Sequence, residues 1–449
     1  MREPIQFPLD QPELTIDLGG GEIRRTVHPS GLRILTERMP AARSASIGFW
    51  VGVGSADEQA VSNEAPGSLG STHFLEHLLF KGTPSRDAYE IATSFDRIGA
   101  EHNALTAKEY TCYYAKVRDA DLEHATVVLT DMVANSVLDE KEFETERGVI
   151  LEELAMAADD LGDVASERLF EEVLRGHALG RPIGGNNETI RAAKRDDVLR
   201  HYKEQYDPST LIVTAAGAVD HDRFVEIVLR ELGLADSAQW DLNVDRTPVR
   251  RPAATLEWAG TAGAPALVER TSEQVNLMLG TPALRNGDPR RYAYGIMNSV
   301  LGGGMSSRLF QEIREKRGLA YTAYSFGASY TDAGLFGMYA GMAPANAVEV
   351  MELAKAELAR LADQGITEEE LERTLGQVAG SSALALEDSD TRMSRLARAE
   401  MTSGEFYDLD MSLERYAAVT NEEIQSMAQT LAAQPLQIVA VGAVEGLGL

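Results

Sequence analysis

The residues best suited to chemistry in this sequence are two histidines and a glutamate close together, His73, Glu76 and His77. In a helix over residues 71–81 they would share one face, because positions i, i+3 and i+4 are neighbours on a helix surface. The other positions of this helix are nearly all apolar, so we expect it to be buried. Two imidazoles and a carboxylate are costly in such surroundings unless they are hydrogen-bonded or bind a metal. Two histidines one turn apart suit two corners of a tetrahedral zinc site, which we therefore predict here.

A catalytic zinc ion usually has three protein ligands, and the missing one could lie on a helix that begins near Asp139. Glu146 and Glu153 lie two turns apart on the stripe of this helix that also carries Phe143 and Ile150, so both are expected on its buried side. We predict Glu153 as the third ligand and Glu146 as a carboxylate that orients a histidine or the metal site. The other glutamates of this helix fit the alternative, solvated surface charges: Glu140, Glu142, Glu144 and Glu152.

Composition limits the kinds of partner. The formal charge of -28 and the pI near 4.7 argue against nucleic acid and anionic membranes as partners. They would suit an interior that attracts cationic peptides, although an acidic surface that aids solubility is an equally good explanation. Cys112 is the sole cysteine, so no internal disulfide can form, which fits a reducing compartment. We find neither a secretory signal nor a run of about 18 apolar residues, and we expect a cytoplasmic protein that does not span a membrane.

The chain repeats itself. Residues 217–220 (Gly-Ala-Val-Asp) match residues 442–445 (Gly-Ala-Val-Glu), 225 positions later, and residues 138–143 are echoed by 366–371. So long a period indicates duplication of a whole domain. We predict an α+β fold of two homologous domains, each a mostly antiparallel sheet packed against helices. The N-terminal zinc-binding domain would span residues 1–234, a linker 235–265, and a C-terminal domain without metal ligands 266–449, since no histidine follows His221.

Strands and helices are placed by their local patterns. A hairpin is expected over residues 24–37, a central strand over 45–53, further strands over 103–106 and 110–117, and a buried strand from Leu211. The polar loop of residues 54–70 is long enough to be functional or mobile. It leads directly into the helix that carries the two histidines.

The sequence resembles the pitrilysin family of zinc peptidases, in particular its short two-domain members, which include the subunits of mitochondrial processing peptidase and bacterial relatives. The resemblance spans residues 31–444 and includes the order His-x-x-Glu-His, the inverzincin signature. It rests on these segments: residues 73–83, 99–106, 146–153, 176–182, 301–310 and 314–321. Two departures, a longer loop over residues 60–68 and Thr72 in place of a small apolar residue, bear on specificity rather than on chemistry.

For the metal site, the resemblance implies a zinc-dependent endopeptidase that holds one zinc ion per chain. It implies that His73, His77 and Glu153 bind zinc, that Glu76 is the general base, and that Glu146 supports the site. The zinc would polarise the scissile carbonyl and lower the pKa of a water molecule towards about 7. Glu76 would take the proton and pass it to the leaving amine.

For substrate and partner, the resemblance implies short or unfolded peptides cleaved inside a clamshell of two subunits. Asn103 and Ala104 would hold the substrate backbone as an added strand. Arg314 and Tyr321 would face the zinc of the other subunit and steady the tetrahedral intermediate. A homodimer is expected, because one chain carries both sets of residues. The alternatives are the zinc-bearing subunit of a heterodimeric processing peptidase and a non-catalytic scaffold subunit.

Overall fold

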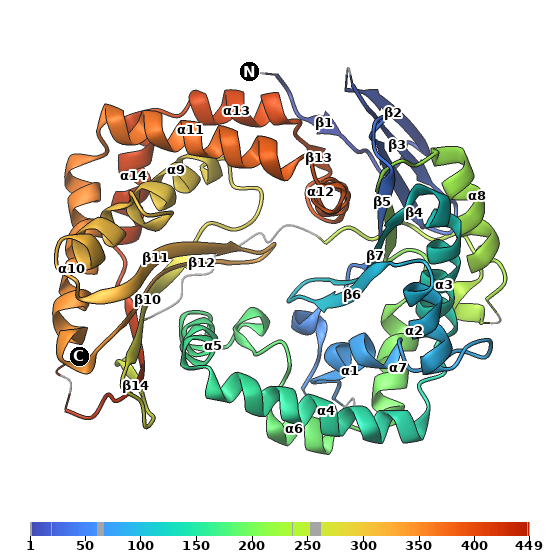
Figure 1. Cartoon of the computed structure of the whole chain (residues 1–449), viewed down its shortest axis with the longest axis horizontal. Coiled ribbons are helices and arrows are strands. Elements are labelled where there is room, and N and C mark those ends of the chain that lie inside the picture. Colours follow the sequence, from blue (N-terminus) through green and yellow to red (C-terminus); the bar gives the residue numbers. More distant parts are fainter. Residues whose placement is uncertain are drawn as a thin grey trace.

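Two mixed sheets form the framework of the molecule, one on each side of the view in Figure 1. The computed structural model describes residues 2–18, 20–60, 67–235, 237–251, 262–446 and 448. Each sheet is covered by helices, and the predicted α+β fold with two related halves is confirmed. Residues 252–261 of the predicted linker and residues 61–66 of the loop before the first helix lie outside the described residues.

The first sheet has seven strands and contains the segments predicted for the N-terminal half. Its order is β2 (Glu13–Asp17), β3 (Glu22–Val27), β4 (Arg33–Arg38), β8 (Leu211–Gly217), β5 (Ser44–Val51), β7 (Thr111–Arg118) and β6 (Glu101–Thr106). Among these strands, every neighbouring pair is antiparallel except β4 and β8. The predicted hairpin is β3–β4, and the predicted central strand is β5 between β8 and β7.

The second sheet repeats this arrangement with five strands. Its order is β9 (Ala266–Glu269), β14 (Gln437–Gly442), β10 (Val275–Ala283), β12 (Gly334–Met342) and β11 (Ala320–Ser329), with β9 and β14 as the parallel pair. Gly217 pairs with Ala45 in the first sheet, and Gly442 pairs with Val275 in the second. The two glycines, 225 residues apart, therefore occupy equivalent positions in the two sheets, which supports duplication of a domain.

Helices surround both sheets. In the first half they are α1 (Ser71–Leu78), α2 (Ala88–Asp96), α3 (Leu122–Asn135), α4 (Glu140–Asp159), α5 (Leu161–Val173), α6 (Asn187–Ala192), α7 (Arg195–Gln205) and α8 (His221–Leu232). In the second half they are α9 (Arg291–Gly302), a π-helix (Phe310–Glu315), α10 (Ala347–Gln364), α11 (Glu368–Ala385), α12 (Ser389–Met401), α13 (Leu409–Ala417) and α14 (Asn421–Ala432). None of the described helices is long and apolar enough to cross a membrane.

One predicted helix is shorter than expected. The helix predicted over residues 71–81 ends at Leu78. After it the N–H groups bond to the carbonyl three residues earlier instead of four, from Phe80 to His77 and from Lys81 to Leu78. Such tightened turns are common at helix ends. All three residues that the pattern placed on one face still lie within α1.

The two halves exchange one helix each. α5 follows α4 in the first half, yet its Leu169 and Val173 pack with Met278 and Val439 of the second sheet. α12 follows α11, the counterpart of α4, and its Leu396 packs against the first sheet. Figure 1 shows α12 beside the first sheet and α5 near the second. The predicted linker therefore separates the two sheets along the sequence, but the halves are not independent in space.

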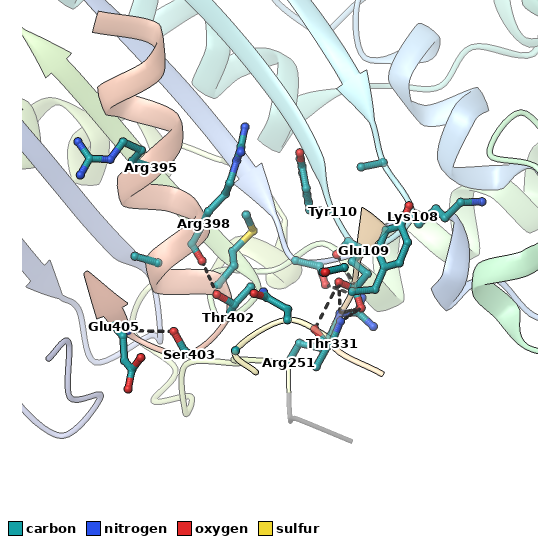
Figure 2. A pocket seen from close by; sticks show the side chains of 18 of the residues that line it. Lys108, Glu109, Tyr110, Arg251, Thr331, Arg395, Arg398, Thr402, Ser403 and Glu405 are labelled. Atoms are coloured by element: carbon teal, nitrogen blue, oxygen red, sulfur yellow. Dashed lines mark hydrogen bonds and ion pairs between the residues drawn. The ribbon is translucent and has the colours of Figure 1, made fainter. Parts of the chain in front are cut away.

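The junction between the halves also contains a crevice of about 950 Å³. Figure 2 shows its wall, in which Glu109 accepts a hydrogen bond of 3.0 Å from the N–H of Thr331, across the two halves. Arg251 forms an ion pair with Asp57 at the same place. Part of the predicted linker thus packs onto the first half, where Trp240 is also fully buried.

His221, at the start of α8, makes the stability of the first half depend on pH. Its ring lies between the hydroxyls of Thr26 and Thr36, each 2.9 Å away, and burial lowers its pKa to about 4. Since an unfolded histidine titrates near 6.5, the folded state binds fewer protons between these values, and stability falls as the pH drops from about 6.5 to about 4.

We expect His221→Gln to remove about 2–3 kcal/mol of this loss. Urea unfolding midpoints of both proteins across this pH range would measure it. The exposed His124, changed to Gln, is the control, and parallel curves for wild type and His221→Gln would contradict the prediction.

Candidate metal centre

The helix α1 is held in place by its apolar side chains. Phe74, Leu75 and Leu78 are fully buried, and Phe74 stacks on Phe143 of α4 with ring centroids 4.6 Å apart. The opposite face carries His73 and His77, whose side chains are 16% and 15% exposed. Packing against α4 therefore fixes the orientation of both imidazoles.

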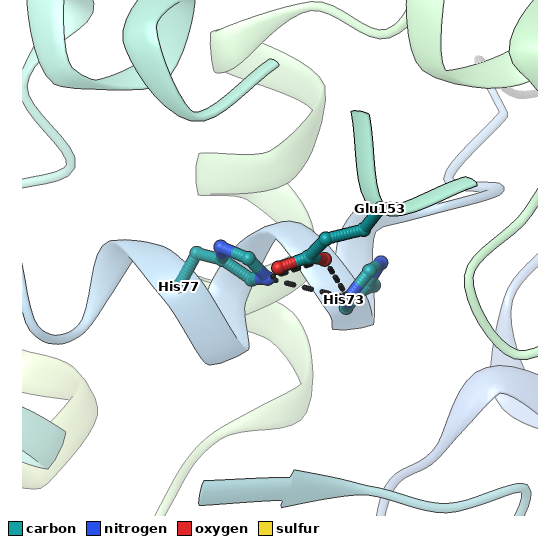
Figure 3. Close-up of side chains that lie close together, drawn as sticks. All are labelled: His73, His77 and Glu153. Atoms are coloured by element: carbon teal, nitrogen blue, oxygen red, sulfur yellow. Dashed lines mark hydrogen bonds and ion pairs between the residues drawn. The ribbon is translucent and has the colours of Figure 1, made fainter. Parts of the chain in front are cut away.

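Three ligand atoms converge beside this helix. Figure 3 shows Glu153 reaching from α4 towards His73 and His77. The two Nε2 atoms are 3.3 Å apart, and Glu153 Oε2 lies 3.5 Å from that of His73 and 3.4 Å from that of His77. Bonds of about 2.0–2.1 Å in a tetrahedral zinc site place the ligand atoms about 3.3–3.4 Å apart. The three atoms thus form one face of a tetrahedron of the size that zinc requires.

The protonation of the two rings agrees with metal binding. Nδ1 of His77 lies 2.9 Å from Oε2 of Glu146, and a carboxylate can only accept, so Nδ1 carries a proton; in the neutral ring this leaves the lone pair on Nε2. Burial lowers the pKa of His73, which favours the neutral ring. Lone pairs directed at one another and at a carboxylate repel unless a cation lies among them. The donor set of these three residues therefore fits Zn²⁺.

Glu146 and Glu153 differ in burial, which the sequence pattern did not predict. Glu146 is 3% exposed and also forms an ion pair of 2.8 Å with Lys81. The Glu153 side chain is 46% exposed, so the expectation that both glutamates lie on the buried side of α4 was wrong for Glu153. Its Oε2 lies beside His73 and His77 of α1 instead of in the core.

Glu146 should determine how tightly the metal is held. Glu146→Ala removes the acceptor that orients His77 and takes the paired carboxylate from Lys81, so we expect the zinc dissociation constant to rise by about 10- to 100-fold. Competition with a chromophoric chelator would measure it. Glu152→Ala, an exposed glutamate on the same helix, is the matched control and should keep the wild-type affinity. Equal affinities for Glu146→Ala and wild type would refute the role of Glu146.

Glu76 lies on the same side of α1 and is not one of the three converging residues. Its side chain is half-buried. Within the described part of the chain it forms no hydrogen bond or ion pair.

Asn103 and Ala104 lie on β6, the edge strand of the first sheet. An edge strand offers unpaired backbone groups to an extended peptide. Here the N–H of Ala104 donates to Oδ1 of Asn103 at 2.9 Å. An added strand would bond to this N–H only after the Asn103 side chain turns away.

Arg314 and Tyr321 lie in the second half, on the π-helix and on the edge strand β11. The guanidinium group lies over the ring of Tyr321, 4.4 Å from its centroid, and donates to its carbonyl oxygen at 3.1 Å. Tyr321 is 75% exposed beside a groove of about 280 Å³. Among the described residues, no hydrogen bond, ion pair or ring contact joins this pair to His73, His77 or Glu153.

The sequence patterns above do not indicate two residues that lie near the site. Lys81 lies four residues after His77, and its helical spacing could have indicated that it meets the same carboxylate. Glu58 hydrogen-bonds to the start of α1 from the preceding loop. A glutamate in an aperiodic polar loop gives no signal of this kind.

Comparisons with known proteins agree with the sequence and the site. The model described as Insulinase (Peptidase family M16) matches residues 33–187, and the one described as Peptidase M16 inactive domain matches residues 192–378. A protein of Streptomyces coelicolor described as an uncharacterized zinc protease is 44% identical over 411 residues, 92% of this chain and 87% of that protein. One of Bacillus subtilis with the same description is 37% identical over 409 residues, 91% of this chain and 95% of that protein.

Solved structures share the fold at lower identity. A structure titled as a peptidase M16 inactive domain from Pseudomonas fluorescens superposes with a TM-score of 0.81 at 18% identity, covering 94% of this chain and 98% of the other. A protease from Helicobacter pylori gives a TM-score of 0.80 at 22% identity and covers 94% and 99%. The family models and the close relatives together show that this chain belongs to peptidase family M16, the pitrilysin family that its sequence resembles.

Proposed function

We propose that this chain is a zinc-dependent endopeptidase that cleaves short or unfolded peptides. One zinc ion per chain would be held by His73, His77 and Glu153. The observation that carries the proposal is the triangle of their ligand atoms, with edges of 3.3, 3.4 and 3.5 Å. Glu76, on the same side of α1, has a side chain that forms no hydrogen bond or ion pair among the described residues. The relatives from Streptomyces coelicolor and Bacillus subtilis are described as zinc proteases, which supports the same proposal.

Each residue has a distinct task in this proposal. Zinc, when bound, would act as a Lewis acid that polarises the scissile carbonyl and lowers the pKa of a water molecule towards about 7. Glu76 accepts a proton from the attacking water and delivers it to the leaving amine. Glu146 keeps His77 in the tautomer whose Nε2 is free. Asn103 and Ala104, on the edge strand β6, hold the substrate backbone in extended form.

A second copy of the chain completes the site in this proposal. Arg314 and Tyr321 are donors suited to a developing oxyanion, but among the described residues no contact joins them to His73, His77 or Glu153 of their own chain. Their exposure, and the groove beside them, suit a role towards another subunit. Because one chain carries both sets of residues, a homodimer would contain two complete sites. A heterodimer, in which this chain supplies only the zinc set, is the alternative that the tests below separate.

The proposal is tested on the wild-type protein. We expect about one zinc per chain by elemental analysis, and cleavage of an unfolded-peptide library that stops when zinc is removed by a chelator and returns when zinc is added back. Zinc without cleavage would point to a missing partner subunit or a scaffold. Absence of zinc would overturn the proposal.

Mixing two inactive variants tests the shared site. Glu76→Gln and Arg314→Ala should each be inactive alone, the second because its partner loses an oxyanion donor. Since random exchange makes about half of the dimers mixed, and each of these has one intact site, activity should return to about a quarter of wild type. Cleavage rates after subunit exchange would measure this recovery. Glu76→Gln mixed with Glu76→Gln/Arg314→Ala is the control without recovery. Absence of recovery in the test mixture, with exchange verified by mass spectrometry, would contradict a site shared between two copies.

A further inference from the structure

The helix α1 starts without a capping side chain of its own. Gly70 precedes it with φ of 85°, a conformation that favours glycine, and a Cβ there would lie 2.8 Å from Cδ1 of Ile190. A larger residue here would have a strained backbone and would push against Ile190. The first N–H groups of a helix have no partner within the helix, so the start of α1 depends on an acceptor from elsewhere.

Glu58 supplies that acceptor from twelve residues earlier. Its Oε2 accepts the N–H of Gly70 and its Oε1 accepts the N–H of Thr72, both at 2.8 Å. The residue is 5% exposed, so these two bonds are shielded from water. A carboxylate at this end of a helix is also favoured by the helix dipole.

The backbone of Glu58 is itself fixed. The guanidinium group of Arg181 donates to the carbonyl oxygens of Ser55, Ala56 and Glu58 at 3.3, 3.1 and 2.8 Å. The carbonyl of Arg181 in turn accepts from Nζ of Lys108 at 2.7 Å, in the turn between β6 and β7. The segment after Arg181 also lies against the site, because a Cβ on Gly184 would come within 3.5 Å of Nδ1 of His73.

We propose that Glu58 is a positioning residue for the metal centre, which fixes the first turn of α1 and thereby the place of His73. This inference rests on the proposed function. His73 is the residue after Thr72, whose N–H Glu58 holds, while His77 is fixed separately by Glu146. A turn free to unwind at Gly70 would move one imidazole relative to the other. Metal sites tolerate little of this, since ligands must keep their geometry to within about 0.5 Å.

The test compares zinc affinity in two variants at pH 8, because burial raises the pKa of Glu58 to about 7 and the carboxylate is then ionised. We expect Glu58→Ala to raise the zinc dissociation constant by about 10- to 100-fold in a chelator competition. Glu58→Gln should raise it less, because the amide oxygen still accepts one of the two N–H groups. The visible spectrum of the cobalt-substituted protein should change in both variants, since it reports ligand geometry.

Asp220→Ala is the matched control, because Asp220 caps α8, where its Oδ1 accepts the N–H of Arg223 at 2.9 Å. It should lower the melting temperature without changing zinc affinity. The inference is overturned if Glu58→Gln keeps the wild-type zinc affinity and cobalt spectrum, whatever its melting temperature; Glu58→Gln carries the test if Glu58→Ala does not fold. A wild type that binds zinc but cleaves nothing refutes only the proposed function. A wild type that binds no zinc refutes both.

Discussion

Glu76→Gln is expected to slow peptide cleavage by about 10²- to 10⁴-fold while leaving the zinc content unchanged. Glutamine has nearly the same size and shape as glutamate but cannot accept and release a proton at neutral pH. No structural bond is lost, because Glu76 forms no hydrogen bond or ion pair among the described residues, and the three converging ligand atoms belong to other side chains. The measurement is kcat on an unfolded fluorogenic peptide, with zinc determined on the same sample.

Two further variants make this result specific. Glu152→Gln removes an exposed carboxylate from α4 and should cleave at the wild-type rate. Glu153→Gln changes a proposed ligand and should lose zinc together with activity. If Glu76→Gln also lost its zinc, Glu76 would belong to the ligand set rather than act as the base. Cleavage by Glu76→Gln at the wild-type rate would remove it from the chemistry.

The elements of the site could be predicted from sequence because their signals are local. Helical spacing alone places His73 and His77 on one face of α1, and the same spacing places Glu146 against the core on α4. Glu153 was assigned to the correct helix, but its exposure was not predicted. Burial of a residue depends on what packs opposite it in the folded chain, and the periodicity of α4 holds no information about that.

The exchange of helices between the halves could not be predicted for a related reason. An amphipathic helix shows which face it buries but not which sheet it meets. α5 and α12 each follow a helix of their own half, and short connections usually join elements that are neighbours in space. Here both cross to the other sheet, and the duplication explains why they do so in the same way.

A buried glutamate on α12 marks this crossing. Glu400 continues the apolar stripe of Met393, Leu396 and Ala397, and this position in the pattern could have indicated a buried charge. It is fully buried and lies 3.2 Å from Arg25, 3.6 Å from Arg33 and 2.9 Å from Arg250. Arg25 and Arg33 come from β3 and β4 of the first sheet, so this cluster joins the second half to the core of the first.

Removing the charge of Glu400 should therefore destabilise the whole chain. Three guanidinium groups would lose their shared carboxylate, and two of them, on Arg25 and Arg33, are also fully buried. Breaking a buried ion pair by removing one partner costs about 3–5 kcal/mol, because an uncompensated charge remains inside. We expect Glu400→Gln to lower the free energy of unfolding by about this amount, measured by urea denaturation.

The matched control is Asp390→Asn on the same helix. Asp390 pairs with Lys116 of the first sheet at 3.4 Å but is 35% exposed, and such surface pairs contribute about 0–1 kcal/mol. α12 is part of the second half in sequence but packs in the core of the first half. If the exchanged helices hold the halves together, both halves of Glu400→Gln should therefore unfold in one transition, at a lower urea concentration than in the wild type. A variant as stable as Asp390→Asn would mean that the arginines find other partners. Two separate transitions would mean that the halves unfold independently despite the exchange.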